Sequence, residues 1–332
     1  MLVKRTVTGI KPTGTPHVGN YIGAIKPALQ LAENPERETM YFMADLHALN
    51  AVHDARKLKE MTYEVAATWL ALGLNPDTSL FYRQSEVPEL VELQWILASV
   101  TSKGLMNRAH AYKARVSENM EHDREADDGI NMGLYNYPVM MAADILMFQG
   151  DEVPVGKDNV QHVEMARDIA GAFNRTYEDT FKLPSHVINE HGAVVPGLDG
   201  RKMSKSYDNT IPLFVEEHVL EKLVKRVITD SKGPDEPKDT NNSTLFTLYQ
   251  EFATNEEIAQ MKRSYQEGIG YGKIKEELFR VMNRTLQTPR SVYRELMNDQ
   301  QKIDQLLHEG AGRARNEAQT MMHTVKKRVG LK

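Results

Sequence analysis

The stretch "KRTVTGIKPTGTPHVGNYIGAIKPALQL", residues 4–31, decides the fold class of this chain. Its first seven residues are rich in β-branched side chains and end beside a glycine, which predicts a strand over residues 4–10. A loop of glycines and prolines follows over residues 11–16. Apolar residues then recur at helical spacing, which predicts a helix from about His17 to Leu31; they are Val18, Ile22, Ile25 and Leu29.

The same alternation of strand and helix continues for about 170 residues. Strands are predicted at 39–44, 79–84 and 152–156, and helices at 54–74, 88–100, 138–148 and 158–173. Near-continuous apolar strands that alternate with helices favour a parallel sheet covered on both faces. The acidic segment 116–131 lacks apolar periodicity and is predicted to be an exposed loop.

The character of the sequence changes after about Pro212. From there on the patterns are helical, at 215–228, 245–252, 255–266, 271–286, 289–298 and 302–329. We therefore predict two domains, an α/β domain over residues 1–211 and a helical domain over residues 212–332.

Composition excludes several classes of function. The 332 residues contain no cysteine, which excludes disulfides, thiolate catalysis and cysteine-built zinc sites. No apolar run approaches the roughly 18–20 residues of a membrane span. The net charge of −5 argues against a general nucleic-acid binder, although residues 221–332 carry a small positive excess. A cytoplasmic protein with neither a membrane nor DNA as its partner is expected.

Two segments carry chemistry. A glycine-rich turn that leads into a helix brings backbone N–H groups to one point, which suits a phosphate, and His17 and Asn20 lie one helical turn apart at its mouth. The spacing is neither that of a dinucleotide fingerprint nor that of a Walker loop. A basic loop, "KMSKS" at residues 202–206, can close over a polyphosphate. Taken singly, a capped tight turn and a solvated basic loop explain them as well.

Together, "HVGN" at residues 17–20 and "KMSKS" resemble the two signatures of class I aminoacyl-tRNA synthetases. Chain length, motif order and the helical C-terminal part resemble the tyrosyl/tryptophanyl subgroup. The resemblance implies a Rossmann-type doubly wound parallel sheet and a helical anticodon-binding domain. It also implies a homodimer formed through a helical insertion around 85–150.

The implied reaction joins an amino acid and ATP, with Mg²⁺, into an aminoacyl-adenylate and transfers the aminoacyl group to the 3′-terminal ribose of tRNA. By the same resemblance, the catalytic residues are His17, Asn20, Lys202 and Lys205. No protein-built metal site is expected. The further residues expected to bind ATP are Lys11, Pro12, Thr13, Gly19, Gly156, Lys157, Asp158, Val195, Met203, Ser204 and Ser206.

The segment "YPVMMAADI" bears on the choice of amino acid. Tyr137, Met141 and Asp144 fall at i, i+4 and i+7, on one helix face. Tyrosyl members resemble this pattern with glutamine in the middle, whereas Met141 offers a soft apolar wall to a large ring. Asp144 can accept a hydrogen bond from an indole N–H. The pattern resembles the tryptophanyl members, which implies L-tryptophan and tRNA(Trp) as substrates; a core helix with one satisfied Asp is the structural alternative.

Further candidates for the tryptophan pocket are His47, Val153, Val155, Asn159 and Gln161. Asn159 replaces a glutamine that the family uses for the substrate amino group. Either Asn159 reaches that group through a water molecule, or Gln161 or Tyr137 takes over. His162 is interpreted as a helix-surface or supporting residue. Lys11 replaces a common glutamine, and His17 a common threonine. In the helical part, the residues available for RNA are Tyr249, Tyr265, Tyr271, Arg280 and Arg284.

Three alternative functions stay open on the sequence alone. A tyrosyl-tRNA synthetase is disfavoured by Met141. A related adenylate-forming ligase, such as a pantothenate synthetase, is disfavoured by the long helical C-terminal part. A catalytically silent paralogue is disfavoured by the intact His17, Asn20, Lys202 and Lys205.

Overall fold

Five parallel strands form the sheet at the centre of the computed structural model, which describes residues 3–156, 159–188 and 195–332. The strands are β1 (Lys4–Ile10), β2 (Arg37–Met43), β3 (Leu80–Arg83), β4 (Glu152–Val155) and β5 (Ser185–Ile188), in the order β3-β2-β1-β4-β5. The chain moves outward from β1 to one edge and then to the other, which is the doubly wound arrangement. The predicted parallel sheet is confirmed, and β5 is an additional strand that its short, half-exposed sequence did not reveal.

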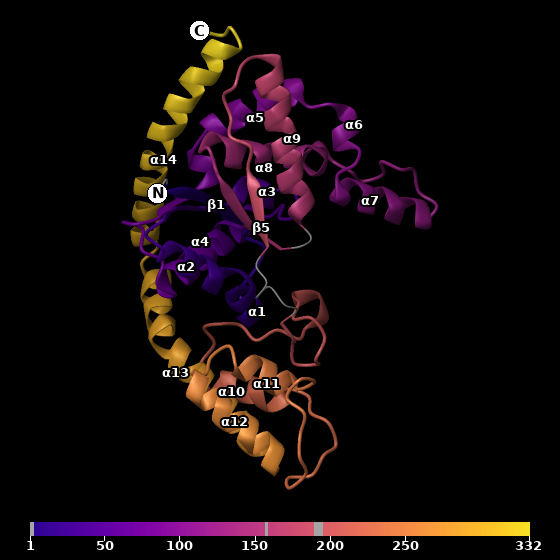
Figure 1. The fold of residues 1–332 in the computed structure, drawn as a ribbon, viewed down its shortest axis with the longest axis vertical. Coiled ribbons are helices and arrows are strands. Elements are labelled where there is room, and N and C mark those ends of the chain that lie inside the picture. Colours follow the sequence, from indigo (N-terminus) through magenta and orange to yellow (C-terminus); the bar gives the residue numbers. More distant parts are fainter. Residues whose placement is uncertain (1–2, 157–158, 189–194) are drawn as a thin grey trace.

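Helices cover both faces of this sheet and continue into a second group (Figure 1). The opening helix is made of α1 (Val18–Asn20), a π-helical turn η1 (Tyr21–Ile25) and α2 (Lys26–Ala32). The others, with two 3-10 turns, are α3 (Asp45–Ala48), α4 (Ala55–Ala71), η2 (Gln84–Glu86), α5 (Glu89–Val100), α6 (Lys103–Met106), α7 (His110–Glu121), α8 (Met132–Met147), α9 (Val160–Thr176), η4 (Lys205–Tyr207), α10 (Glu217–Arg226), α11 (Thr244–Tyr249), α12 (Asn255–Glu267), α13 (Tyr271–Asn298) and α14 (Gln300–Arg328). None of these helices combines the length and the apolar character that crossing a membrane requires.

Three predicted boundaries are wrong. The loop predicted at 116–131 is helical as far as Glu121, and the buried side chain of Asn119 ties the following turn by donating to the carbonyls of Ala126 and Asp128. The helix predicted to start at Pro138 starts six residues earlier and contains that proline. One helix, α13, replaces the pair predicted on either side of Pro289. Its first half buries apolar residues in the core of the helical group, and its second half buries Leu296 in a core that α14 shares.

The last helix leaves the helical group and packs on the sheet. Figure 1 shows α14 running along one side of the sheet while α10, α11 and α12 lie together at the far end of α13. The buried apolar residues of α14 belong to the two core clusters that cover the sheet; they are Ile303, Leu307, Ala311, Ala314, Ala318, Met322 and Val325. Gly310 lets the helix backbone touch β3, because a Cβ there would lie 1.8 Å from the carbonyl oxygen of Phe81. The domain boundary at 211 stays a prediction, and residues 300–328 share their packing with the N-terminal part.

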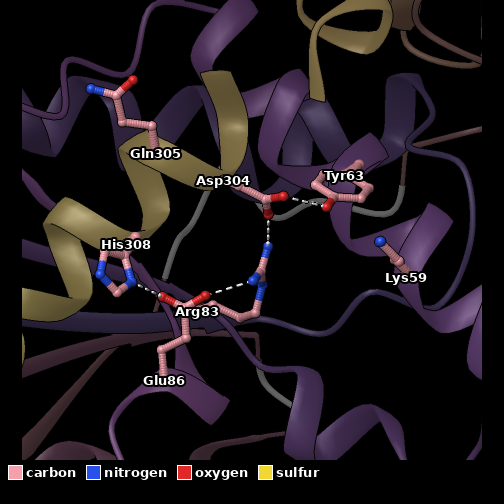
Figure 2. Close-up of a pocket in the computed structure, with 7 residues that line it drawn as sticks. All are labelled: Lys59, Tyr63, Arg83, Glu86, Asp304, Gln305 and His308. Carbon is pink, nitrogen blue, oxygen red and sulfur yellow. Dashed lines mark hydrogen bonds and ion pairs between the residues drawn. The ribbon is translucent and has the colours of Figure 1, made fainter. Parts of the chain in front are cut away.

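Polar contacts reinforce the docking of α14 on the end of β3. The Arg83 guanidinium donates to Asp304 of α14 at 2.7 Å, and the hydroxyl of Tyr63 in α4 donates to the same carboxylate at 2.7 Å (Figure 2). His308 lies 3.6 Å from Glu86. These residues surround a hollow of about 490 Å³ between α4, the end of β3 and α14.

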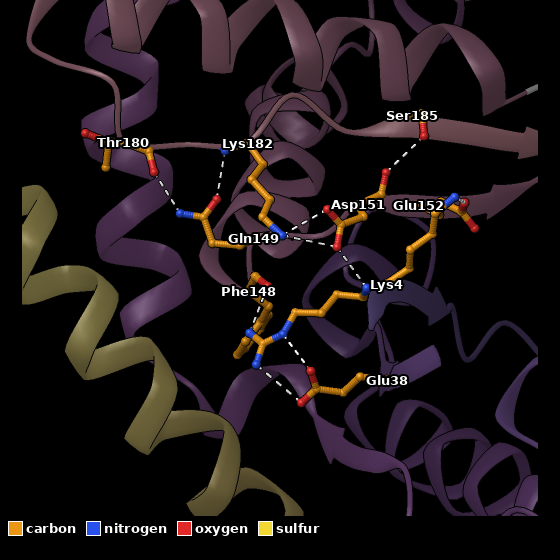
Figure 3. A network of polar contacts seen from close by, with 10 residues as sticks. Lys4, Glu38, Phe148, Gln149, Asp151, Glu152, Thr180, Lys182 and Ser185 are labelled. Atoms are coloured by element: carbon orange, nitrogen blue, oxygen red, sulfur yellow. Dashed lines mark hydrogen bonds and ion pairs between the residues drawn. The ribbon is translucent and has the colours of Figure 1, made fainter. Parts of the chain in front are cut away.

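A second polar network lies at the amino ends of the strands (Figure 3). The Lys182 ammonium donates to Asp151 at 2.9 Å, and the backbone N–H of Arg5 donates to the same carboxylate. Gln149 donates to the carbonyl of Thr180 and accepts from the N–H of Lys182. Ligands in open α/β sheets bind at the opposite, carboxyl ends of the strands. We therefore assign this network to the stability of the β1–β4–β5 edge.

Candidate active site

The first signature lies where β1 ends and the opening helix begins. His17 is 7% exposed, and its backbone N–H donates to the side-chain oxygen of Asn20 at 3.0 Å, which caps the helix start. Asn20 itself is exposed, so its NH₂ group is open to a ligand. The N–H of Val18 donates to the carbonyl of Ile211, and the N–H of Leu213 donates to that of Pro16. The segment just after the basic loop is therefore anchored beside the first signature.

The second signature meets the first directly. The sulfur of Met203 accepts from the N–H of Gly19 at 3.2 Å, and the ammonium of Lys205 lies 3.4 Å from the carbonyl oxygen of Thr13. Gly14 has a φ of +121°, and a Cβ there would lie 2.7 Å from the Lys205 ammonium. The positive φ favours glycine at this position, and the short distance shows how closely the Lys205 side chain approaches the loop. Two segments almost two hundred residues apart in sequence thus form one surface.

A side chain that the sequence analysis gave no role holds the basic loop in shape. Asn209 accepts from the N–H of Ser204 at 2.8 Å and donates to the carbonyl of Lys202 and to the carboxylate of Asp199. Its position just after the lysine- and serine-rich run was the only available signal. Because Asn209 is buried, it fixes the loop backbone while both lysines stay exposed.

Electrostatics at this surface favour an anion. Burial and the nearby Lys205 ammonium lower the pKa of His17 to about 4, so the imidazole is neutral near pH 7. Among the described residues, its Nδ1 atom is buried without a hydrogen-bond partner. Burial lowers the pKa of Lys205 from its ordinary value. The two exposed lysines, the buried Nδ1 of His17 and the exposed Asn20 side chain lie together here and suit phosphate oxygens. The backbone N–H groups of His17, Val18 and Gly19 are already bonded within the protein.

The second part of the site lies on α8, at the carboxyl end of the sheet. Tyr137 and Met141 are partly exposed, and Asp144, on the same face, is 1% exposed. The Asp144 carboxylate is 3.0 Å from Nε2 of His47. It also accepts from the amide nitrogen of Gln84 at 2.8 and 2.9 Å. Burial raises the pKa of Asp144.

Gln84 is the residue of this group that the sequence analysis missed. It follows β3 directly, at the edge of the sheet where ligands bind, and that position was a usable signal. The sequence did not reveal its partner, because Gln84 and Asp144 are 60 residues apart and meet only through the packing of α8 on the sheet.

His162 connects Tyr137 to Asn159 by hydrogen bonds. Its Nε2 atom hydrogen-bonds the hydroxyl of Tyr137, and its Nδ1 atom lies 3.2 Å from the side-chain oxygen of Asn159. The rings of Tyr137 and His47 meet edge to face, with centroids 6.2 Å apart. His162 is 4% exposed, so of the two interpretations offered above, the supporting role fits the structure and the surface role does not.

Other candidates lie differently. Gln161 is turned away from this group, because its amide donates to the carbonyl of Arg108 and accepts from the N–H of His110. Val153 is buried in the core, Val155 is partly buried, and Gly156 is exposed. Lys157 and Asp158 lie outside the described residues. The carbonyl of Val195 accepts from the N–H of Met203. Lys11, Thr13 and Ser206 are exposed beside the loops, and Pro12 is buried.

Most of the residues suggested for RNA have structural partners. Tyr249 and Tyr265 are core residues at 2% and 0% exposure. Arg280 and Arg284 both bind Glu257, at 2.9 and 2.7 Å.

As for metals, no group of three or more His, Cys, Asp or Glu side chains within the described ranges is placed to hold an ion.

Comparison with known proteins identifies the family of the chain. A family model described as class I tRNA synthetases (W and Y) matches residues 4–287. The tryptophan–tRNA ligase of Neisseria meningitidis is 48% identical over 333 residues, which cover 100% of this chain and 99% of the relative. That of Bordetella parapertussis is 50% identical over 98% of this chain and 73% of the relative. A crystal structure of the Campylobacter jejuni tryptophanyl-tRNA synthetase, complexed with ADP and tryptophan, is similar with a TM-score of 0.89 and 40% identity, over 98% of this chain and 99% of that chain.

Proposed function

Because the chain belongs to the class I tRNA synthetases for tryptophan and tyrosine, we infer that its reaction is the ligation of tryptophan to tRNA. The observation that carries this inference is the meeting of the two signatures, in which Lys205 and Met203 reach the loop and helix that contain Gly14 and Gly19. The full-length similarity to tryptophan–tRNA ligases supports the amino acid.

The first step activates tryptophan. An oxygen of the tryptophan carboxylate attacks the α-phosphorus of ATP, and the bond to the β-phosphate oxygen breaks, so pyrophosphate leaves with the electron pair. No general base is required, since the carboxylate is ionised near pH 7. Catalysis rests on positioning and on charge stabilisation. ATP enters as its Mg²⁺ complex, with the ion carried on the phosphate oxygens.

We assign the phosphates to the joined signatures. His17, neutral near pH 7, and the exposed Asn20 donate to phosphate oxygens at the helix start. Lys202 and Lys205 stabilise the negative charge that develops on pyrophosphate. The remaining adenine nucleotide contacts are assigned to the candidates named above, from Lys11 to Thr13, Gly156 to Asp158, Val195, and Met203 to Ser206.

We assign the indole ring to the face of α8. Met141 and Val155 lie against it, and Asp144 accepts from the indole N–H. The hydrogen bonds around Asp144 support an acceptor role, since His47 and Gln84 both hold its carboxylate. Asn159, held by His162, faces the substrate amino group, and Tyr137 shares that role.

In the second step, the 3′-terminal ribose of tRNA(Trp) attacks the acyl carbon and AMP leaves. We propose that α10 to α13 contact the anticodon and that the enzyme works in the cytoplasm as a homodimer. The α5 face supports the dimer, because Val91 and Trp95, one turn apart, are 47% and 80% exposed. Such a pair on one helix face suits burial against a second copy.

The deciding experiment is ATP–pyrophosphate exchange with tryptophan and, separately, with tyrosine. We expect exchange with tryptophan only, followed by charging of tRNA(Trp). Exchange with tyrosine alone would make the chain a tyrosyl enzyme. Absence of exchange with either amino acid, in a protein that binds tRNA, would favour the catalytically silent alternative.

A further inference from the structure

We propose that Gln84 is a positioning residue for amino-acid recognition, and that α14 holds it in place through Arg83 and Asp304. The inference rests on the proposed function, because it concerns how the Asp144 carboxylate meets the indole N–H. It assigns a role in substrate choice to the last helix of the chain, which lies on the outer side of the sheet.

The first step is the contact between Gln84 and Asp144. The Gln84 amide nitrogen lies 2.8 and 2.9 Å from the two carboxylate oxygens, so it faces both at once. Both side chains are buried, at 0% and 1% exposure. A carboxylate held across both oxygens cannot rotate freely, and its remaining lone pairs keep fixed directions. Its ability to accept from an indole N–H therefore depends on where Gln84 stands.

The second step is what fixes Gln84. It opens the 3-10 turn η2, in which the N–H and hydroxyl of Ser85 both donate to the buried Asp45, at 3.0 and 2.5 Å. On the other side of the turn, Arg83 donates to Glu86 at 2.5 Å. Two carboxylates thus hold the turn, Asp45 on one side and Glu86 on the other. Of these two, only Glu86 faces α14.

The third step connects the turn to α14. Arg83 uses its second terminal nitrogen to bind Asp304, and Asp304 is held in turn by Tyr63. Figure 2 shows Arg83 between Glu86 and Asp304, with His308 on the far side of Glu86. Six residues after Asp304, Gly310 sets the helix directly on the carbonyl of Phe81. The position of α14 therefore determines the position of η2. It does so through the ion pair of Arg83 with Asp304 and through the backbone contact of Gly310 with Phe81.

A donor-free analogue separates recognition from general stability. β-(1-Benzothiophen-3-yl)alanine has nearly the shape of tryptophan but carries sulfur in place of the indole N–H. The ratio of kcat/KM for tryptophan to that for the analogue, measured by pyrophosphate exchange, reports the hydrogen bond to Asp144. A purely structural defect lowers both values together and leaves the ratio unchanged.

Three variants test the connection. Gln84→Met keeps the side-chain length and removes the donor, and we expect the ratio to fall at least about tenfold, as for loss of a hydrogen bond to a charged group. Asp304→Asn keeps the shape of a half-exposed residue and weakens the hold on Arg83, and we expect a fall of about threefold. Glu92→Gln is the matched control, since it removes another ion pair to α14, with Lys326, which lies 22 residues beyond Asp304 along that helix. Its ratio should equal that of the unmodified enzyme.

The outcomes are distinguishable. If the unmodified enzyme shows no exchange with tryptophan, the proposed function itself fails. If it prefers tryptophan to the analogue but both Gln84→Met and Asp304→Asn keep that preference, the positioning role alone is overturned. Should Gln84→Met fail to fold, Asp304→Asn decides, because its side chain is 48% exposed and its loss does not open the core. An equal fall of the ratio in Glu92→Gln would also refute the route through Asp304.

Discussion

Substituting alanine at two glycines of α14 should change stability in opposite directions. Gly310 faces the sheet, and a Cβ there would lie 1.8 Å from the carbonyl oxygen and 2.8 Å from the carbonyl carbon of Phe81. Since a carbon–oxygen contact needs about 3.3 Å, the helix would have to move by roughly 1.5 Å. The obstacle is strand backbone, which cannot rotate aside. We expect Gly310→Ala to lower the free energy of unfolding by about 3 kcal/mol.

Gly312→Ala is the matched control in the same helix. Nothing lies within 4 Å of the position its Cβ would take, and the residue is exposed. Alanine in a helix interior is favoured over glycine, so this variant should gain roughly 0.5–1 kcal/mol.

Urea unfolding provides the measurement. It is followed by far-UV circular dichroism and by tryptophan emission, in which the change comes from the buried Trp69, since Trp95 is already exposed. Trp69 shares a core cluster with Ile303 and Leu307 of α14. The two variants should differ by about 3–4 kcal/mol. Equal midpoints, or a stabilised Gly310→Ala, would refute the direct contact of α14 with β3.

Three further predictions concern charged groups. Lys205→Ala should lower tryptophan-dependent pyrophosphate exchange by about a hundredfold while tryptophan binding stays nearly constant, and unchanged exchange would remove Lys205 from the mechanism. His17 has a folded-state pKa of about 4, below its ordinary 6.5, so the unfolded chain takes up the proton first. The lowered pKa therefore contributes about 3 kcal/mol to the free energy of unfolding, a contribution that is fully present above pH 6.5 and is lost as the pH falls towards 4. A His17→Gln variant should lack this pH dependence in urea titrations. Arg290→Met should raise stability by about 1 kcal/mol, because two of the Arg290 nitrogens are buried without partners among the described residues; a lower midpoint would contradict this.

The sequence predicted the fold where local pattern and tertiary packing agree. Strands β1 to β4 contain β-branched or apolar residues flanked by loop residues. The helix predicted from residue 54 is confirmed as α4, and the Asp54 carboxylate caps it by accepting from the N–H groups of Arg56 and Lys57. Prediction failed where packing overrides local preference. Pro289 marks a break by its missing N–H, yet α13 continues through it because the helix buries apolar residues on both sides. In α7, exposed polar residues gave no periodic signal.

From the sequence, site residues could be grouped only where they lie on the same helix or strand. Tyr137, Met141 and Asp144 share a face of one helix, so counting residues was enough to group them. Gln84 could not be added in this way, because its partner comes from an element that becomes a neighbour only after folding. The direction of the Gln161 side chain could not be predicted either, because it also depends on how α9 packs. The rotation of α9 about its axis decides which residue faces the pocket, and it directs His162 inward and Gln161 towards Arg108.

The basic loop illustrates how a fold can keep charges available for a ligand. Arg201, just before it, is bound to Asp199 at 2.6 Å. In the part of the chain that the structure describes, Lys202 and Lys205 form no such ion pair, and the loop is held instead by the neutral Asn209 and Met203. A carboxylate in either place would fix the loop equally well but would neutralise the lysines. Because the anchors are neutral, the full positive charge is left for phosphate oxygens, and the neutral His17 adds a donor without adding repulsion between cations.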